Sequence, residues 1–147
     1  MSASGSPVTD TLTIGNAIAE LRKVVDFVEN FTAAYDLPKR VTNDLNLCLD
    51  EVLNNTISYG YEDQSAHSIA ITLSLAEGWL IAEIRDDGKP FDPREHGPAP
   101  APAKGAARSR QVGGLGRLFV KALMDKVDYK RISEYNVLTL KKKFAGD

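Results

Sequence analysis

The chain has 147 residues, a length that fits a single domain with its own hydrophobic core. It is 43% hydrophobic and 26% charged, and its net charge of −2 gives no basic field of the kind that attracts nucleic acid or a membrane surface. The single cysteine, Cys48, excludes an intramolecular disulfide, and its apolar sequence neighbours favour a small core residue. No apolar run is long enough to span a bilayer, and residues 1–7 lack the apolar core of a signal peptide, so we expect a cytoplasmic protein.

The N-terminal part of the chain predicts one strand followed by two helices. Apolar and polar residues alternate over 8–14, which is typical of a strand. An apolar stripe at three- and four-residue steps predicts an amphipathic helix over about 17–35, with Asn16 as its N-cap. A second helix is predicted to open at a proline and to run over about 38–59, with Gly60 as its C-terminal cap.

The middle of the chain predicts a hairpin and then a long loop. Alternation over 68–75 and 80–86, separated by a Glu-Gly turn, predicts two antiparallel strands. Residues 87–114 are rich in glycine and proline, and 97–111 contain no large apolar side chain. Such a segment buries too little surface to offset the entropy of ordering, which is typical of a linker, a lid or a binding loop.

The remaining C-terminal segment predicts a helix over 115–124 and strands over 127–132 and 137–144. These elements are too few for an independent domain, so we expect them to complete the sheet begun earlier. We therefore predict a single α+β domain over residues 1–147. Its architecture would be a two-layer sandwich in which helices cover one face of a mixed, mostly antiparallel sheet.

One candidate site pairs a carboxylate with a carboxamide on the second helix. Glu51 and Asn55 are four residues apart, which places them one turn apart on the same helical face. An amide oxygen is a suitable Mg²⁺ ligand, and a carboxylate can orient or deprotonate a hydroxyl. Taken alone, the pair is better explained as a solvated helix face, because this spacing is common.

The second candidate is the turn after the predicted hairpin, Asp86-Asp87-Gly88. An aspartate at the end of a strand, followed by a glycine that lets the backbone turn, can aim its carboxylate into a pocket. Such a carboxylate can accept a hydrogen bond from the exocyclic amine of adenine. An acidic β-turn explains the same residues equally well.

The third candidate is a glycine turn that opens the predicted third helix, made of Gly113, Gly114, Leu115 and Gly116. Backbone N–H groups at such a helix start favour phosphate binding. The turn is neither a P-loop nor a dinucleotide fingerprint, because the residues that define those motifs are missing. Alone it is a weak signal.

In order and separation, the three candidates resemble the N, G1 and G2 boxes of the Bergerat-fold ATPases, the superfamily of gyrase, histidine kinases and mismatch-repair ATPases. Within that superfamily the chain resembles the small bacterial anti-sigma-factor serine/threonine kinases, over about residues 11–144. The matching segments are 49–55, 59–61, 86–93, 113–116, 123–129 and 136–140.

The resemblance implies an ATP site. Asp86 would bind the adenine amine, Gly88 would shape the adenine pocket, and the Gly113–Gly116 turn would approach the phosphates. Asn55 would hold Mg²⁺ and Glu51 would be the general base. Residues 94–112 would form an ATP lid.

The resemblance also implies an activity and partners. The chain would phosphorylate a STAS-type anti-sigma antagonist and control a sigma factor or another regulator by partner switching, as a homodimer. A non-catalytic, nucleotide-dependent binding module is the alternative, and a detached ATPase domain is a third hypothesis. The presence of Glu51 favours the kinase.

Overall fold

The computed structural model describes residues 8–63, 65–93, 120 and 122–144. Its N-terminal half contains β1 (Val8–Gly15), a short 3-10 turn (Ile18–Glu20), α1 (Leu21–Ala34) and α2 (Lys39–Tyr59). The strands β2 (Ser68–Ala76), β3 (Trp79–Asp86), β4 (Lys126–Ile132) and β5 (Tyr135–Lys143) follow. Residues 120, 122 and 123 are helical, so the end of the predicted third helix is described.

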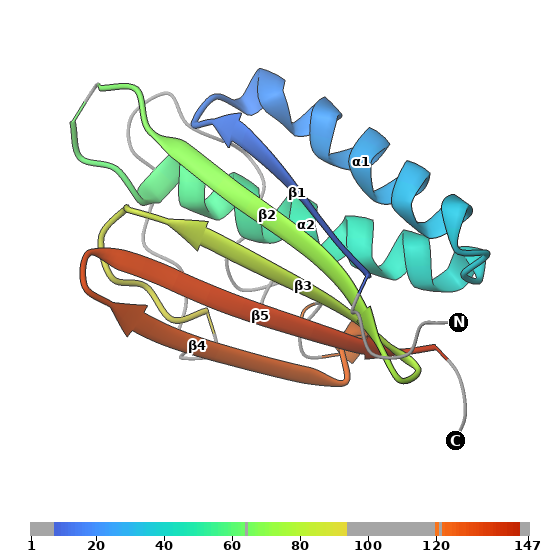
Figure 1. Cartoon of the computed structure of the whole chain (residues 1–147). Helices are drawn as coiled ribbons and strands as arrows, with labels where there is room; N and C mark the ends of the chain where they lie inside the picture. Colours follow the sequence, from blue (N-terminus) through green and yellow to red (C-terminus); the bar gives the residue numbers. More distant parts are fainter. Residues whose placement is uncertain (1–7, 64, 94–119, 121, 145–147) are drawn as a thin grey trace.

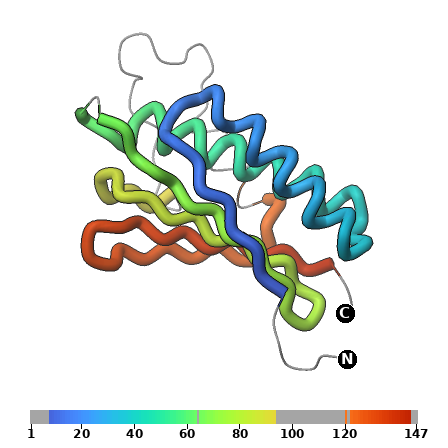
Figure 2. Tube along the Cα trace, turned by 45° about the horizontal axis from the view of Figure 1, so that its top comes forward, coloured from blue at the N-terminus to red at the C-terminus, as the bar shows by residue number. Residues whose placement is uncertain are grey.

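The five strands form one sheet in the order β1-β2-β3-β5-β4. All four pairings between these strands are antiparallel, so this part of the sheet lacks the mixed character that we expected. Helices α1 and α2 lie against one face of the sheet, as Figures 1 and 2 show. The predicted α+β two-layer sandwich is therefore confirmed.

The core lies between the two helices and the inner face of the sheet. Alternate residues of β2, namely Ile69, Ile71 and Leu73, are fully buried there, and their neighbours along the strand are more exposed. Helix α2 supplies the largest helical share of the core: Val41, Leu45, Cys48, Leu49, Val52 and Leu53. Burial raises the pKa of the Cys48 thiol to about 12, which fits a core residue rather than a nucleophile.

Strand register carries one polar residue onto this inner face at the end of β3. Asp86 shares the face with the buried Ile84 and Ala82 because side chains alternate along a strand. It stands opposite Asn136 in the β3–β5 pairing. The C-terminal ends of α2 and β3 lie at the same end of the molecule (Figure 1). This arrangement positions the candidate site.

The prediction that Asn16 caps the first helix is wrong. Its side chain makes no cap; instead Nδ2 donates to the Ser65 carbonyl (3.3 Å) and Oδ1 accepts from the backbone N–H of His67 (3.0 Å). A 3-10 turn precedes α1, so the α-helix begins at Leu21. The Asn16 side chain therefore bonds to a loop that is distant in the sequence, and not to the start of the helix.

Candidate functional site

A pocket lies between α2 and the sheet at the end of the molecule where α2 and β3 finish. Three of the residues predicted from the sequence, Glu51, Asn55 and Asp86, line it together. Apolar side chains from α2, β3 and β5 complete its walls, among them Val52, Ile84 and Leu138. The apolar walls can pack against the faces of a flat ring, and the acidic and amide groups can bind polar atoms at its edge.

The α2 side of the pocket carries the carboxylate–carboxamide pair. Glu51 is buried, with 8% of its surface exposed, so the alternative of a solvated helix face is excluded for this residue. Asn55 Nδ2 donates to Glu51 Oε2 at 3.4 Å, which orients the carboxamide toward its neighbour. Asn55 Oδ1 is buried and accepts no hydrogen bond from the described residues. A buried carbonyl oxygen without a donor suits a hard cation such as Mg²⁺.

The sheet side of the pocket carries Asp86, which is 6% exposed. Its Oδ1 accepts from the backbone N–H of Gly88 (2.8 Å) and from Asn136 Nδ2 (3.0 Å). Burial raises the pKa of Asp86, and these two hydrogen bonds oppose the rise. Both bonds go to Oδ1, so within the part of the chain that the structure describes Oδ2 is left to accept from a further donor such as an amine.

Asn136 holds this end of the site together, and sequence reasoning missed it as a site residue. Its Nδ2 donates to Asp86 and to the Lys89 carbonyl (2.9 Å). Its Oδ1 accepts from the Phe91 N–H (3.3 Å) and from the Tyr129 hydroxyl. An asparagine on the apolar-facing side of a strand was the available signal, since Leu138 and Leu140 share its face.

The glycine at position 88 is explained by a close approach to the end of α2. A Cβ there would lie 2.7 Å from the carbonyl oxygen of Gly60 and 3.0 Å from Asp86 Oδ1. The backbone N–H of Lys89 donates to the same Gly60 carbonyl (2.8 Å). Arg131 Nη1 donates to the Gly88 carbonyl (2.7 Å) and fixes the turn from β4. Only a residue without a side chain lets this turn pack so closely.

Comparison with known families decides the assignment of the chain. The family described as the histidine kinase-like ATPase domain matches residues 14–142, which is most of the sequence. The chain belongs to this family. Its pocket therefore lies in an ATPase-type fold.

Two named relatives and one solved structure resemble this histidine kinase-like ATPase domain. The serine/threonine-protein kinase BtrW of Bordetella bronchiseptica is 27% identical over 135 residues, which cover 92% of this chain and 94% of BtrW. The serine-protein kinase RsbW of Listeria innocua is 26% identical over 86 residues, 57% of this chain and 55% of that protein. The structure of the RsbU and RsbW domains of Rv1364c from Mycobacterium tuberculosis matches with a TM-score of 0.66 and 16% identity, over 99% of this chain and 34% of that one.

These relatives confirm the resemblance to bacterial serine/threonine kinases, and the solved structure confirms the fold. The chain spans about half of the length of RsbW and about a third of the Mycobacterium chain. No helix among the described residues is long and apolar enough to cross a membrane.

Part of the predicted ATP site of this histidine kinase-like ATPase domain lies outside the described residues. That part comprises the glycine turn Gly113, Gly114, Leu115 and Gly116, and the predicted lid over 94–112. Val120, which follows the glycine turn, is described and lines the pocket. The described portion thus holds the carboxylate, the carboxamide and the aspartate of the prediction.

Proposed function

We propose that the chain is an ATP-dependent serine/threonine protein kinase of the anti-sigma-factor type. The observation that carries this proposal is the convergence of Glu51, Asn55 and Asp86 on one pocket. A nucleotide-binding module needs the last two of these residues, whereas a kinase also needs a proton acceptor beside the phosphates. Relatives named as serine or serine/threonine kinases support the same reading.

In the proposed complex, the adenine ring lies against the apolar walls and its exocyclic amine donates to Asp86. Gly88 lets the adenine-side turn approach α2, as its contact with Gly60 requires. The backbone of Gly113, Gly114, Leu115 and Gly116 receives the phosphates at the start of a helix, where N–H groups are unpaired. Residues 94–112 act as the lid, and residues 1–147 form one domain.

Asn55 fits a magnesium ion, because its buried Oδ1 is an acceptor without a partner among the described residues. When bound, Mg²⁺ neutralises charge on the phosphates and stabilises the charge that develops during transfer. Asn55 would contribute one oxygen ligand from α2.

Glu51 is the proposed general base. Its carboxylate takes the proton of a serine or threonine hydroxyl on the protein substrate while the hydroxyl oxygen forms its bond to the γ-phosphorus. The bond from that phosphorus to the β–γ bridging oxygen breaks in the same step, and ADP is the leaving group. The hydrogen bond from Asn55 Nδ2 keeps the carboxylate oriented within the pocket.

The proposed protein substrate is a STAS-type anti-sigma antagonist. Phosphorylation adds about two negative charges to its surface and thereby changes which complex is stable. A sigma factor or another regulator would be held and released in turn, which is partner switching. We propose that the chain acts as a homodimer in the cytoplasm.

Transfer of labelled phosphate from ATP to a purified STAS-type protein tests this function. Transfer that is lost in Glu51→Gln, with nucleotide affinity preserved, is the expected result. Nucleotide binding with no transfer to any STAS-type candidate would instead favour the non-catalytic binding module. Appreciable ATP hydrolysis without an acceptor would favour a detached ATPase domain.

A further inference from the structure

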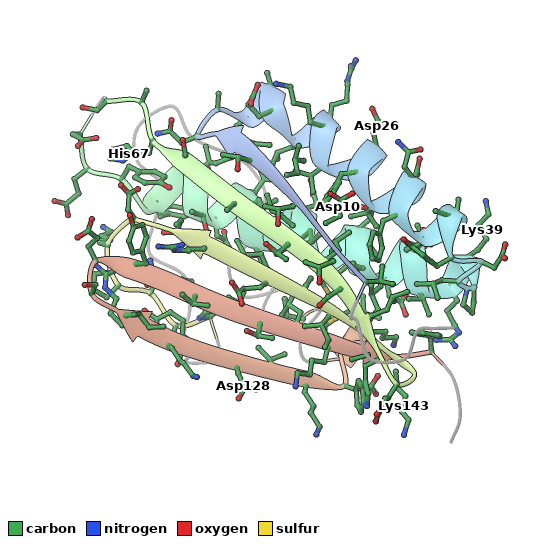
Figure 3. All side chains as sticks on the ribbon, viewed as in Figure 1. Asp10, Asp26, Lys39, His67, Asp128 and Lys143 are labelled. Atoms are coloured by element: carbon green, nitrogen blue, oxygen red, sulfur yellow. The ribbon has the colours of Figure 1, made fainter. Side chains whose placement is uncertain are left out.

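His67 joins two segments that meet beside the candidate nucleotide pocket. It lies in the loop between α2 and β2, at the end of the molecule where α2 and β3 finish (Figure 3). Its Nε2 is 2.9 Å from Asp63 Oδ1, and its Nδ1 is 3.1 Å and 3.3 Å from the two oxygens of Asp87. We call these three side chains the His67 bridge. It links the α2–β2 loop to the turn that contains Asp86 and Gly88.

The His67 bridge requires a protonated ring. An ionised carboxylate only accepts hydrogen bonds, so both ring nitrogens must donate. A neutral imidazole has a single N–H, and its other nitrogen would set a lone pair against a carboxylate. Deprotonation therefore breaks one of the two contacts, so either Asp63 or Asp87 loses its hydrogen bond with His67.

The loop side of the bridge is held in place independently of the proton. The Tyr61 ring stacks on His67 with centroids 4.4 Å apart and planes inclined by 19°. The backbone N–H of His67 donates to Asn16 Oδ1 (3.0 Å), which anchors the loop beside β1. These two contacts keep His67 in the loop when it loses its proton. The contact that deprotonation can break on the pocket side is the one with Asp87.

Among the described residues, the other charged groups that line the hollow around His67 lie on the same two segments. Glu62 and Lys89 line the same surface hollow and are 3.6 Å apart, but both are exposed, so their pair contributes little. On the pocket side, the Asp87 charge disfavours ionisation of Asp86. A protonated His67 beside Asp87 offsets the Asp87 charge close to Asp86, which lines the pocket.

Asp87 is covalently tied to the residues that shape the adenine end of the pocket. It stands between Asp86, which lines the pocket, and Gly88, whose N–H is bonded to Asp86. We propose that His67 is a positioning residue: in its protonated form it holds the Asp86–Gly88 turn in the geometry that binds nucleotide, so nucleotide affinity falls when His67 loses its proton. This inference rests on the proposed function, because it assigns the pocket to a nucleotide.

The hydrogen bonds set the direction of the pH dependence. The bond with Asp63 foremost, and that with Asp87, raise the pKa of His67 above its ordinary value of 6.5, against the opposing effect of partial burial. Because the pKa in the folded chain is the higher one, the bridge is fully formed below 6.5 and is lost as pH rises through the folded value. The pKa of Asp63 is correspondingly lowered by the same contact.

Calorimetric titration with Mg-ADP tests the proposal at two pH values, one below 6.5 and one above the folded pKa of His67. The wild-type affinity should be about two- to fivefold weaker at the higher pH, the effect expected for one partly exposed ion pair. His67→Gln should bind weakly at both values. Since titration of the ADP phosphates is common to both proteins, it cancels in the comparison. Glu62→Gln, which removes a charge from the same hollow, should retain the wild-type profile.

The His67 ring signals measured by NMR give a second readout that needs no change at His67. The His67 pKa should lie above 6.5 in the wild type and fall in Asp87→Asn. Parallel pH profiles for wild type and His67→Gln, or a His67 pKa at or below 6.5, would overturn the inference while leaving the proposed function intact. A wild-type chain that binds no nucleotide at any pH would overturn both.

Discussion

Asp86 and Asn136 face each other across the β3–β5 ladder, and the Asn136 amide donates to Asp86 Oδ1 at 3.0 Å. Both residues are 6% exposed, so water has little access to this contact. Asn136 also hydrogen-bonds to the backbone of the segment after Asp86, at Lys89 and Phe91. The orientation of the proposed adenine acceptor is thus set by a residue on another strand.

Replacing that residue should damage both the fold and the pocket. Asn136→Ala leaves buried acceptors and donors unpaired, so we expect the free energy of unfolding to fall by about 1–3 kcal/mol. Nucleotide affinity should fall as well, because Asp86 loses the donor that orients it. Denaturant unfolding and calorimetric titration with Mg-ADP measure the two effects.

Thr139→Ala is the matched control, because Thr139 lies on the same strand but lines a hollow on the opposite face of the sheet. It should leave nucleotide affinity unchanged. Wild-type affinity in Asn136→Ala would show that Asp86 does not depend on its cross-strand partner.

Asp86 itself should cost stability in the absence of ligand. Its folded pKa is raised above 3.8 by burial, so the folded state prefers the protonated carboxyl. That preference contributes stability below pH 3.8, and the contribution is lost as pH rises through the folded pKa. At neutral pH, Asp86→Asn should therefore have a melting temperature equal to or above that of the wild type, since its amide oxygen can still accept from Gly88 and Asn136. A clearly lower melting temperature would mean that the ionised carboxylate stabilises the fold.

A side chain at position 88 should destabilise the fold, whereas a side chain at Gly15 should be tolerated. In Gly88→Ala the new Cβ would lie 2.7 Å from a backbone oxygen of Gly60, so the turn or the end of α2 must shift. We expect a loss of about 1–3 kcal/mol in the free energy of unfolding, together with weaker nucleotide binding. Gly15→Ala is the control, because its Cβ would meet only the Glu20 side chain, at 3.8 Å. Equal effects in the two variants, measured by chemical denaturation, would contradict this account.

Asn55 should matter for magnesium and little for the apo fold. Asn55→Ala removes a buried oxygen that has no donor among the described residues and introduces a better helix former, but it also removes the 3.4 Å hydrogen bond to Glu51. These effects oppose each other, so apo stability should change little. The affinity for Mg-ADP should fall at least about tenfold, while the affinity for ADP in chelator stays close to the wild-type value.

Asn54→Ala provides the control on the same helix, because the hydrogen bond of its side chain among the described residues goes back to the Asp50 carbonyl in an exposed position. It should leave the magnesium dependence intact. If Asn55→Ala weakened ADP equally with and without magnesium, Asn55 would not be the metal ligand.

Local patterns predicted most of the fold, because each strand and helix carries its own periodicity. The alternation of Ile69, Ile71 and Leu73 and the turn at Glu77–Gly78 reappear in β2 and the β2–β3 hairpin. The sequence motifs also identified three residues that the fold brings to one pocket, Glu51, Asn55 and Asp86.

Contacts between distant segments could not be predicted in the same way. Asparagine is common at helix N-caps, yet the Asn16 side chain binds the loop at 65–67. Asn136 became a site residue only through its register with β3, and the need for glycine at 88 arises from Gly60 in another element. Each of these depends on tertiary geometry, for which a single sequence carries no periodic signal.

Thermal unfolding with and without excess Mg-ATP, in the wild type and in Asp86→Asn, tests the nucleotide pocket most directly. At a ligand concentration about a hundred times the dissociation constant, binding to the folded state alone adds about 2.7 kcal/mol of stability. We predict a clear upward shift in the wild-type melting temperature and none in Asp86→Asn, although that variant is folded. No shift in the wild type, or the same shift in both proteins, would contradict the assignment of the Glu51–Asn55–Asp86 pocket to ATP.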